Sequence, residues 1–256
     1  MIRKLAVIAF SSIAFAVPGL SAGAQSAAEW ISKGNAAYEA RNATDAVGAY
    51  EKALAAEPNN YEALWRASRS QVDLAVAEPN GDKRSAMYKT AQDEAAHAVE
   101  VNPSAADGHF VFAEALGRMA LSLGARDRVK YAGRVRDQAL ECLKIDPKHA
   151  GCLHVMGVWN AEVMRLNGFT RMIARNFLGG QVFAEASWAN ARRDLESSVT
   201  IEPRRIVHRL DLARVYADMG LPALAKKEYE AVISGELMDY NDPRNKADAA
   251  NELKKL

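Results

Sequence analysis

The sequence shows no marked excess of charge of either sign. Its 256 residues include 33 Lys and Arg against 32 Asp and Glu, so the formal net charge is +1. A nucleic-acid-binding domain normally carries a strong basic excess, and we therefore expect no nucleic-acid partner. Glycine and proline are modest in number, at 16 and 8 residues, while alanine is abundant. This balance favours helices, because alanine loses no side-chain entropy on entering one.

The motifs of common enzyme classes are also missing. The sequence contains no Gly-x-Ser-x-Gly elbow, no Walker phosphate loop and no dinucleotide fingerprint. None of its five histidines has the spacing of a helical zinc site, and His149 and His154 lie five residues apart, which directs them to different helix faces. We therefore expect a protein that is not an enzyme and has no metal or cofactor. No segment alternates apolar and polar residues for long enough to indicate a sheet.

The first 24 residues have the layout of a secretory signal peptide. Arg3 and Lys4 form a basic start, residues 5–17 form a short apolar run, and small residues precede Gln25. The apolar run is too short for a comfortable transmembrane span, although an uncleaved anchor is the alternative. No later stretch is long and apolar enough to span a membrane. We expect cleavage after Ala24 and export, to a bacterial periplasm, of the domain formed by residues 25–256.

Only two cysteines are present, Cys142 and Cys152, and they lie nearly symmetrically around Pro147. An oxidising compartment and a helical hairpin centred on Pro147 would permit a disulfide. Two separate buried thiols are an equally good interpretation, because the sequence does not define the directions of the Cβ atoms.

Prolines recur after similar helix-end sequences along the whole chain. The residue before a proline is disfavoured in the α region, and proline can begin a helix but not continue one, so each such pair predicts a helix end. The spacing predicts an array of helical hairpins. The pairs are Glu57-Pro58, Asn102-Pro103, Asp146-Pro147, Glu202-Pro203 and a weaker Asp242-Pro243.

Two of these units resemble the tetratricopeptide repeat, a 34-residue helix–turn–helix with large and small residues at fixed offsets. The first unit departs from the consensus at one position. Ala37 stands where the consensus has an aromatic residue, and the aromatic Tyr38 follows one position later. The first unit supplies Trp30, Gly34, Ala46, Tyr50, Ala53 and Pro58, and the last supplies Leu212, Ala213, Tyr216, Gly220, Ala225 and Tyr229.

The resemblance implies an all-α fold, a right-handed solenoid of about five repeats that ends in a capping helix. The middle repeats are longer than the consensus, and the fourth carries an insertion of roughly twenty residues relative to the family period. Its closing helix is expected to carry the stripe Ala184, Trp188, Ala191, Leu195 and Ser198. The expected repeats lie near residues 27–60, 61–105, 106–149, 150–205 and 206–239, with the cap at 244–256.

The fourth and fifth repeats resemble a narrower family, the regulator of microtubule dynamics family. The segment from His154 to Val163 contains Gly157-Val158-Trp159 and Glu162-Val163, and it is followed by Phe169 and by Phe177-Leu178-Gly179. The resemblance covers the C-terminal two-thirds of the chain. Some members of the family carry a membrane anchor and act at organelle contacts, so the resemblance implies a binding role. An exported bacterial chain would not meet microtubules, so only the fold and the binding role are carried over.

In a tetratricopeptide solenoid the first helix of each repeat lines a concave groove. Aromatic or aliphatic residues beside polar ones in this groove would suit an extended peptide, and Trp, Tyr and Arg are the usual anchors of interfaces. Trp65 and Phe110 could instead pack between repeats. The register predicts that the groove contains Asn35, Tyr38, Trp65, Arg69, Phe110, Glu114, His154, Val158, Leu210 and Arg214.

The insertion around residues 162–183 suggests a second hypothesis. It combines an apolar stripe, Phe169, Met172, Ile173 and Phe177, with a basic pair, Arg171 and Arg175. Such a helix could lie on a lipid surface or dock on a partner, or it could simply fold back onto the solenoid. We therefore expect an adaptor or scaffold for a protein or peptide, with a carrier or surface binder of lipid or another apolar ligand as the alternative. The oligomeric state is not indicated.

Overall fold

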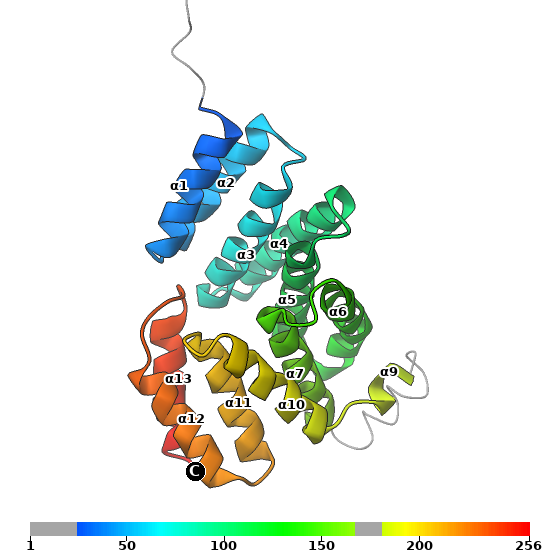
Figure 1. Cartoon of the computed structure of the whole chain (residues 1–256), viewed down its shortest axis with the longest axis vertical. Helices are drawn as coiled ribbons and strands as arrows, with labels where there is room; N and C mark the ends of the chain where they lie inside the picture. The colour runs from blue at the N-terminus through cyan, green and yellow to red at the C-terminus, as the bar shows by residue number, and fades with distance from the viewer. Residues whose placement is uncertain (1–24, 167–180) are drawn as a thin grey trace, which may run out of the picture.

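The computed structural model describes residues 25–166 and 181–256, and the regular structure in this part of the chain is entirely helical (Figure 1). The helices follow one another with short connections. They are α1 (Ala27–Glu39), α2 (Ala43–Ala56), α3 (Tyr61–Ala77), α4 (Gly81–Val101), α5 (Ala106–Ser122), α6 (Ala125–Ile145), α7 (Ala150–Arg165), α9 (Gln181–Ala184), α10 (Trp188–Ile201), α11 (Ile206–Asp218), α12 (Pro222–Ser234) and α13 (Asp242–Leu253).

The helices pair as consecutive hairpins that stack into a solenoid, as the sequence predicts. The first helices of the repeats form one row, in which α1 contacts α3, α3 contacts α5, α5 contacts α7, α7 contacts α11 and α11 contacts α13. The second helices, α2, α4, α6, α10 and α12, each pack against the preceding and following members of that row. The fold is therefore an all-α helical-repeat solenoid.

Local sequence explains where the helices begin and end. Asn42, Asn60, Asn80 and Ser187 are N-caps whose side chains accept a backbone N–H from the first turn. The predicted ends before four prolines are confirmed, because Glu57, Asn102, Asp146 and Glu202 are the C-caps of α2, α4, α6 and α10. The fifth pair behaves differently. Pro243 occupies the first turn of α13, so Asp242-Pro243 begins a helix, as proline's fixed φ permits, and does not end one.

Two further expectations need correction. The capping helix covers residues 242–253 and not 244–256, because it starts at the Asp242-Pro243 pair. The stripe expected to run through Ala184 is also interrupted. Ser187 caps α10 at Trp188, so Ala184 belongs to the short helix α9 and is exposed, whereas Ala191, Leu195 and Ser198 are buried in α10.

Small residues allow the helices to approach closely, as the repeat consensus implies. A Cβ atom added at Gly34 would lie 2.4 Å from the Tyr50 ring, and one at Gly157 would lie 2.5 Å from Cγ of Leu195. Tyr50 and Leu195 are fully buried. The same helix–helix contact thus places a glycine on one side and a large side chain on the other, which is how a close-packed core avoids voids.

The two ends of the solenoid touch each other. Arg41 Nη1 donates to the Leu237 carbonyl at 2.7 Å, Asn241 Nδ2 to the Asp73 carbonyl at 3.0 Å, and Arg244 Nη1 to the Val76 carbonyl at 2.6 Å. We call these three hydrogen bonds the closure contact. They bring the C-terminal segment back against α1 and α3, as the positions of α13, α1 and α3 in Figure 1 show. The solenoid is therefore closed by polar contacts on one side.

None of the helices in the described part of the chain combines the length and apolar character that crossing a membrane would require.

Candidate functional site

Three residues of the predicted groove form a stack at its N-terminal end. The guanidinium carbon of Arg69 lies 3.8 Å from the centre of the Tyr38 ring and 5.0 Å from that of Trp65. Arg66 covers Trp65 as well, at 4.4 Å. Tyr38 comes from α1, and the other residues come from successive turns of α3. Stacking of this kind is favourable and holds the flat guanidinium in one orientation.

Arg69 has no hydrogen bond or ion pair with any residue that the structure describes, and its Nε atom is buried without a partner. A buried donor without a partner costs free energy unless a water or a ligand satisfies it. The stacked guanidinium is therefore a positioned donor group with unused capacity.

Asp73 follows Arg69 by one turn of α3. Its Oδ1 atom accepts from Asn241 Nδ2 at 3.3 Å, while its Oδ2 atom is buried without a partner. Burial, with the nearby charges of Glu114 and Asp239, raises the pKa of Asp73 to about 7. Burial and the charge of Asp73 also raise the pKa of Tyr38 far above its ordinary value. The inner face near the closure contact thus holds a carboxyl group that is easily protonated.

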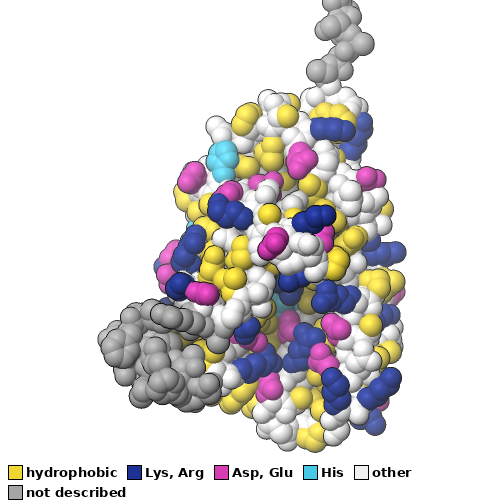
Figure 2. Space-filling view, turned by 180° about the vertical axis from the view of Figure 1, so that it is seen from behind, with side chains coloured by type: hydrophobic (Ala, Val, Ile, Leu, Met, Phe, Trp, Pro, Cys, Tyr) yellow, Lys and Arg dark blue, Asp and Glu magenta, His cyan; other side chains and the backbone are white. Residues whose placement is uncertain are grey.

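A pocket of about 400 Å³ lies farther along the same face, between α5, α6 and α7, with contributions from α11 and α13. We call it the central pocket. Its volume falls in the range of small-ligand sites. Figure 2 shows the molecule hollowed on one face, with side chains of both charge signs around the hollow.

The apolar wall of the central pocket comes mainly from α6 and α7. Trp159 and Phe183 stack with ring centroids 6.1 Å apart, and Trp159 Nε1 donates to the Ala132 carbonyl at 2.8 Å. Val135 and Val163 complete this wall, and all four of the pocket-lining side chains Val135, Trp159, Val163 and Phe183 belong to one buried cluster. Because the indole N–H already has a partner, this wall offers contact area without an unsatisfied polar group.

The charged side of the central pocket consists mostly of ion pairs. His154 Nε2 lies 2.8 Å from Asp211 Oδ2, and Arg214 contacts both Asp211 at 3.0 Å and Glu252 at 2.7 Å. Burial opposes ionisation of Asp211, but the hydrogen bond from His154 and the charges of His154 and Arg214 hold its pKa well below the ordinary value. Asp211 therefore stays ionised at neutral pH.

Two charged residues of the central pocket are exceptions. Glu114 and Arg118 lie one turn apart on α5, and neither has a hydrogen bond or ion pair with any described residue. Both signs of charge are thus available to a molecule that enters the pocket.

The structure brings most of the predicted groove residues into two sites, the stack and the central pocket. Tyr38, Trp65 and Arg69 come together in the stack, and Glu114, His154, Val158 and Arg214 line the central pocket. Asn35 accepts the hydroxyl of Tyr50 at 2.8 Å and so links α1 to α2. The predicted insertion residues Phe169, Arg171, Met172, Ile173, Arg175 and Phe177 lie outside the described residues.

Two of the predicted groove residues belong to the packing between helices. Leu210 is 1% exposed in the C-terminal core, so its expected place in the groove is wrong. On α11 the predicted Arg214 does line the pocket, but the residue beside it there is Asp211 and not Leu210. Phe110 is partly buried and covers Gly151, where an added Cβ would lie 2.5 Å from its ring, so it fills the space between repeats.

Sequence reasoning missed several residues of this face, including Asp73, Arg118, Trp159, Asp211 and Glu252. For two of them a signal was present. Asp73 and Arg118 each follow a predicted groove residue, Arg69 and Glu114, by four positions, which places them on the same face of the helix. The other three depend on how distant helices pack.

Cys142 and Cys152 are joined by a disulfide across the turn between α6 and α7, with their Cα atoms 6.4 Å apart. Both cysteines are fully buried. The structure thus selects the disulfide from the two interpretations that the sequence left open.

Comparisons with known proteins agree with this architecture. A thermophilic tetratricopeptide-repeat protein from Thermus thermophilus superposes with a TM-score of 0.64 at 19% identity, over 88% of this chain and 99% of that one. At this identity the likeness establishes the fold alone.

Curated relatives match a shorter part of the chain. Regulator of microtubule dynamics protein 1 from Bos taurus is 25% identical over 120 residues, which is 46% of this chain and 38% of the relative. Regulator of microtubule dynamics protein 3 from Xenopus laevis is 23% identical over 116 residues, 45% of this chain and 25% of the relative. The match thus spans well under half the length of these relatives.

The family model covers more of the chain than the sequence motif does. The model described as regulator of microtubule dynamics protein 1-3 matches residues 30–256, from the first helix to the last residue. The chain belongs to the regulator of microtubule dynamics protein 1-3 family.

Proposed function

We propose that this protein is a scaffold that binds an extended segment of a protein partner along its inner face, and that it acts by binding and not by catalysis. The observation that carries the proposal is Arg69, whose guanidinium lies against Tyr38 and Trp65 and has no hydrogen bond or ion pair with any described residue. Arg, Trp and Tyr are the residue types that dominate interface energies. Because the guanidinium is already oriented, it loses less conformational entropy when it donates a hydrogen bond to a carbonyl or carboxylate group of the partner.

The central pocket supports the same role. It lies on the face that carries the stack, and its apolar wall of Trp159, Phe183, Val135 and Val163 could take a large side chain of the bound segment. The unpaired Glu114 and Arg118 would then contact polar groups beside that side chain. Two anchors spaced along the groove would define the register of an extended peptide.

Selection of peptides from a random dodecamer phage library on the purified chain tests this function. We expect the selected peptides to bind Arg69→Ala and Trp65→Ala at least about 10-fold more weakly than the wild type, the effect of losing one interface anchor. Arg69→Lys should also weaken binding, because an ammonium group does not reproduce a stacked planar fork. Titration calorimetry gives the affinities.

The matched control is Arg192→Ala. Arg192 on the outer helix α10 also lies over an aromatic ring, that of Tyr216 at 5.7 Å, but it is paired with Glu196 at 2.8 Å. Its removal should leave peptide binding unchanged. Equal binding by the wild type and the Arg69 variants would refute the assignment of the stack as the binding site.

We propose in addition that the protein is exported and acts in a bacterial periplasm. The support is the N-terminal sequence, with its basic start at Arg3 and Lys4, its apolar run and the small residues before Gln25. Intact-mass measurement of the protein recovered from the periplasmic fraction of an expressing bacterium should give a chain that begins at Gln25. Recovery of the full-length chain in the cytoplasm would contradict the proposal.

A further inference from the structure

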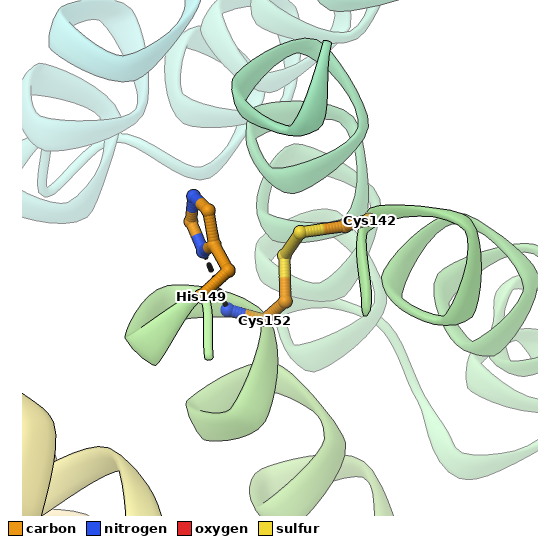
Figure 3. A group of neighbouring side chains, drawn as sticks. All are labelled: Cys142, His149 and Cys152. Carbon is orange, nitrogen blue, oxygen red and sulfur yellow. Dashed lines mark hydrogen bonds between the residues drawn. A yellow bond between two sulfur atoms is a disulfide. The ribbon is translucent and has the colours of Figure 1, made fainter. Parts of the chain in front are cut away.

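The disulfide lies beside a third residue that can ligate metals. Figure 3 shows His149 close to the bond between Cys142 and Cys152. One ring nitrogen of His149 and the two sulfur atoms all lie within 4.8 Å of one another. Cys142 is in the last turn of α6, Cys152 is in the first turn of α7, and His149 is the N-cap of α7. The two helix ends therefore bring three soft or borderline donor atoms to one point.

A backbone hydrogen bond to His149 selects the tautomer that a metal site needs. Nδ1 accepts the backbone N–H of Cys152 at 3.2 Å, so it carries a lone pair and the ring proton is on Nε2. Nε2 lies 3.6 Å from Oδ1 of Asp107. A histidine that directs one nitrogen at a metal and the other N–H at a carboxylate is the usual arrangement in zinc sites, where the carboxylate orients the ring.

We propose that the reduced form of this protein binds one Zn²⁺ through Cys142, His149 and Cys152, and that the disulfide and the metal exclude each other. Two thiolates and one imidazole are donors that Zn²⁺ prefers, with a water molecule as the fourth ligand. The imidazole side chain is 17% exposed whereas both cysteines are fully buried, so solvent and metal reach the site from the side of His149.

The chemistry balances with a dithiol as the reductant. The dithiol gives two electrons and two protons to the Cys142–Cys152 bond and becomes a disulfide itself, which leaves two thiols on the protein. Zn²⁺ then displaces one proton from each thiol and takes the Nδ1 lone pair of His149 in place of the Cys152 N–H. Oxidation reverses the exchange, because a disulfide has no thiolate to offer. The site would thus make metal binding depend on the redox state.

Metal titration of the purified full chain, reduced with a phosphine and desalted under nitrogen, tests the proposal. Co²⁺ is the spectroscopic probe, since its thiolate charge-transfer bands report sulfur ligation, and Zn²⁺ should displace it. We expect one Co²⁺ per reduced chain and none per oxidised chain. His149→Asn should weaken binding at least about 10-fold, and Asp107→Asn about 10-fold through the lost orientation of the ring.

His149→Asn keeps the helix N-cap, because Asn is a favoured capping residue, so the fold should survive and circular dichroism can verify it. His97→Asn, at a partly buried histidine that contacts Asn59, is the control and should bind Co²⁺ as the wild type does. The proposal is overturned if the reduced wild type binds no Co²⁺. Equal Co²⁺ binding by His149→Asn and the wild type also overturns the proposal. The two cysteine thiols alone would then bind the metal, without His149.

Discussion

Asp73→Asn is expected to stabilise the protein, by roughly 1–2 kcal/mol at pH 5 and roughly 4 kcal/mol at pH 8. The pKa of Asp73 is about 7 in the folded chain, whereas the ordinary value is 3.8. Between these values the folded state holds a proton that the unfolded state has lost, so the wild type loses stability as pH rises from about 4 to about 7. Asn is neutral throughout and can still accept the hydrogen bond of Asn241.

Other groups titrate in the same range, so the prediction concerns the difference between the variant and the wild type. Burial and the charge of His154 lower the pKa of His208 to about 2, which makes stability rise with pH through the ordinary range of histidine. Burial, with the charges of Glu51 and Asp93, raises the pKa of Glu94 to about 8, which acts in the same direction as Asp73. Both contributions are shared by the two proteins and cancel in the difference.

Urea unfolding followed by circular dichroism at pH 5, 6, 7 and 8 and constant ionic strength measures this difference. Asp137→Asn is the control, because Asp137 is exposed on α6 and should show little change at any pH. The same pH slope for Asp73→Asn and the wild type would show that Asp73 is ionised in the folded protein.

Loss of the disulfide should lower the free energy of unfolding by about 2–3 kcal/mol, as expected for a closed loop of this length. The bond joins residues ten positions apart and constrains the unfolded chain. Cys142→Ala/Cys152→Ala, compared with the oxidised wild type in guanidinium unfolding, measures the effect together with a small packing loss. The reduced wild type keeps both cysteine side chains. Its difference from the oxidised wild type therefore gives the effect of the bond without the packing loss.

The metal proposal makes the reduced wild type the more informative protein. If Zn²⁺ binds the folded reduced chain, adding it should recover part of the lost stability, in proportion to the logarithm of its free concentration. The alanine pair should show no such recovery. Equal stability of the oxidised and reduced wild type would contradict the prediction, because the bond would then have no net effect through its constraint on the unfolded chain.

Local sequence predicted most of the solenoid because its determinants act over a few residues. Glu57, Asn102, Asp146 and Glu202 end helices through steric effects of the next proline, and this physics is the same in any tertiary context. The stack of Tyr38, Trp65 and Arg69 was predictable for a similar reason. The repeat register sets which helix face points inward, and Arg69 follows Trp65 by one turn.

Sequence alone thus determined the helix ends before four prolines, the repeat fold and the stack of Tyr38, Trp65 and Arg69. Tertiary structure alone decided that Leu210 is buried, that Asn241 and Arg244 close the solenoid against α3, and that His149 faces the Cys142–Cys152 bond. The reason is that each of these depends on the small rotation between successive repeats. Such rotations accumulate over many helices, and no local rule of propensity or capping defines them.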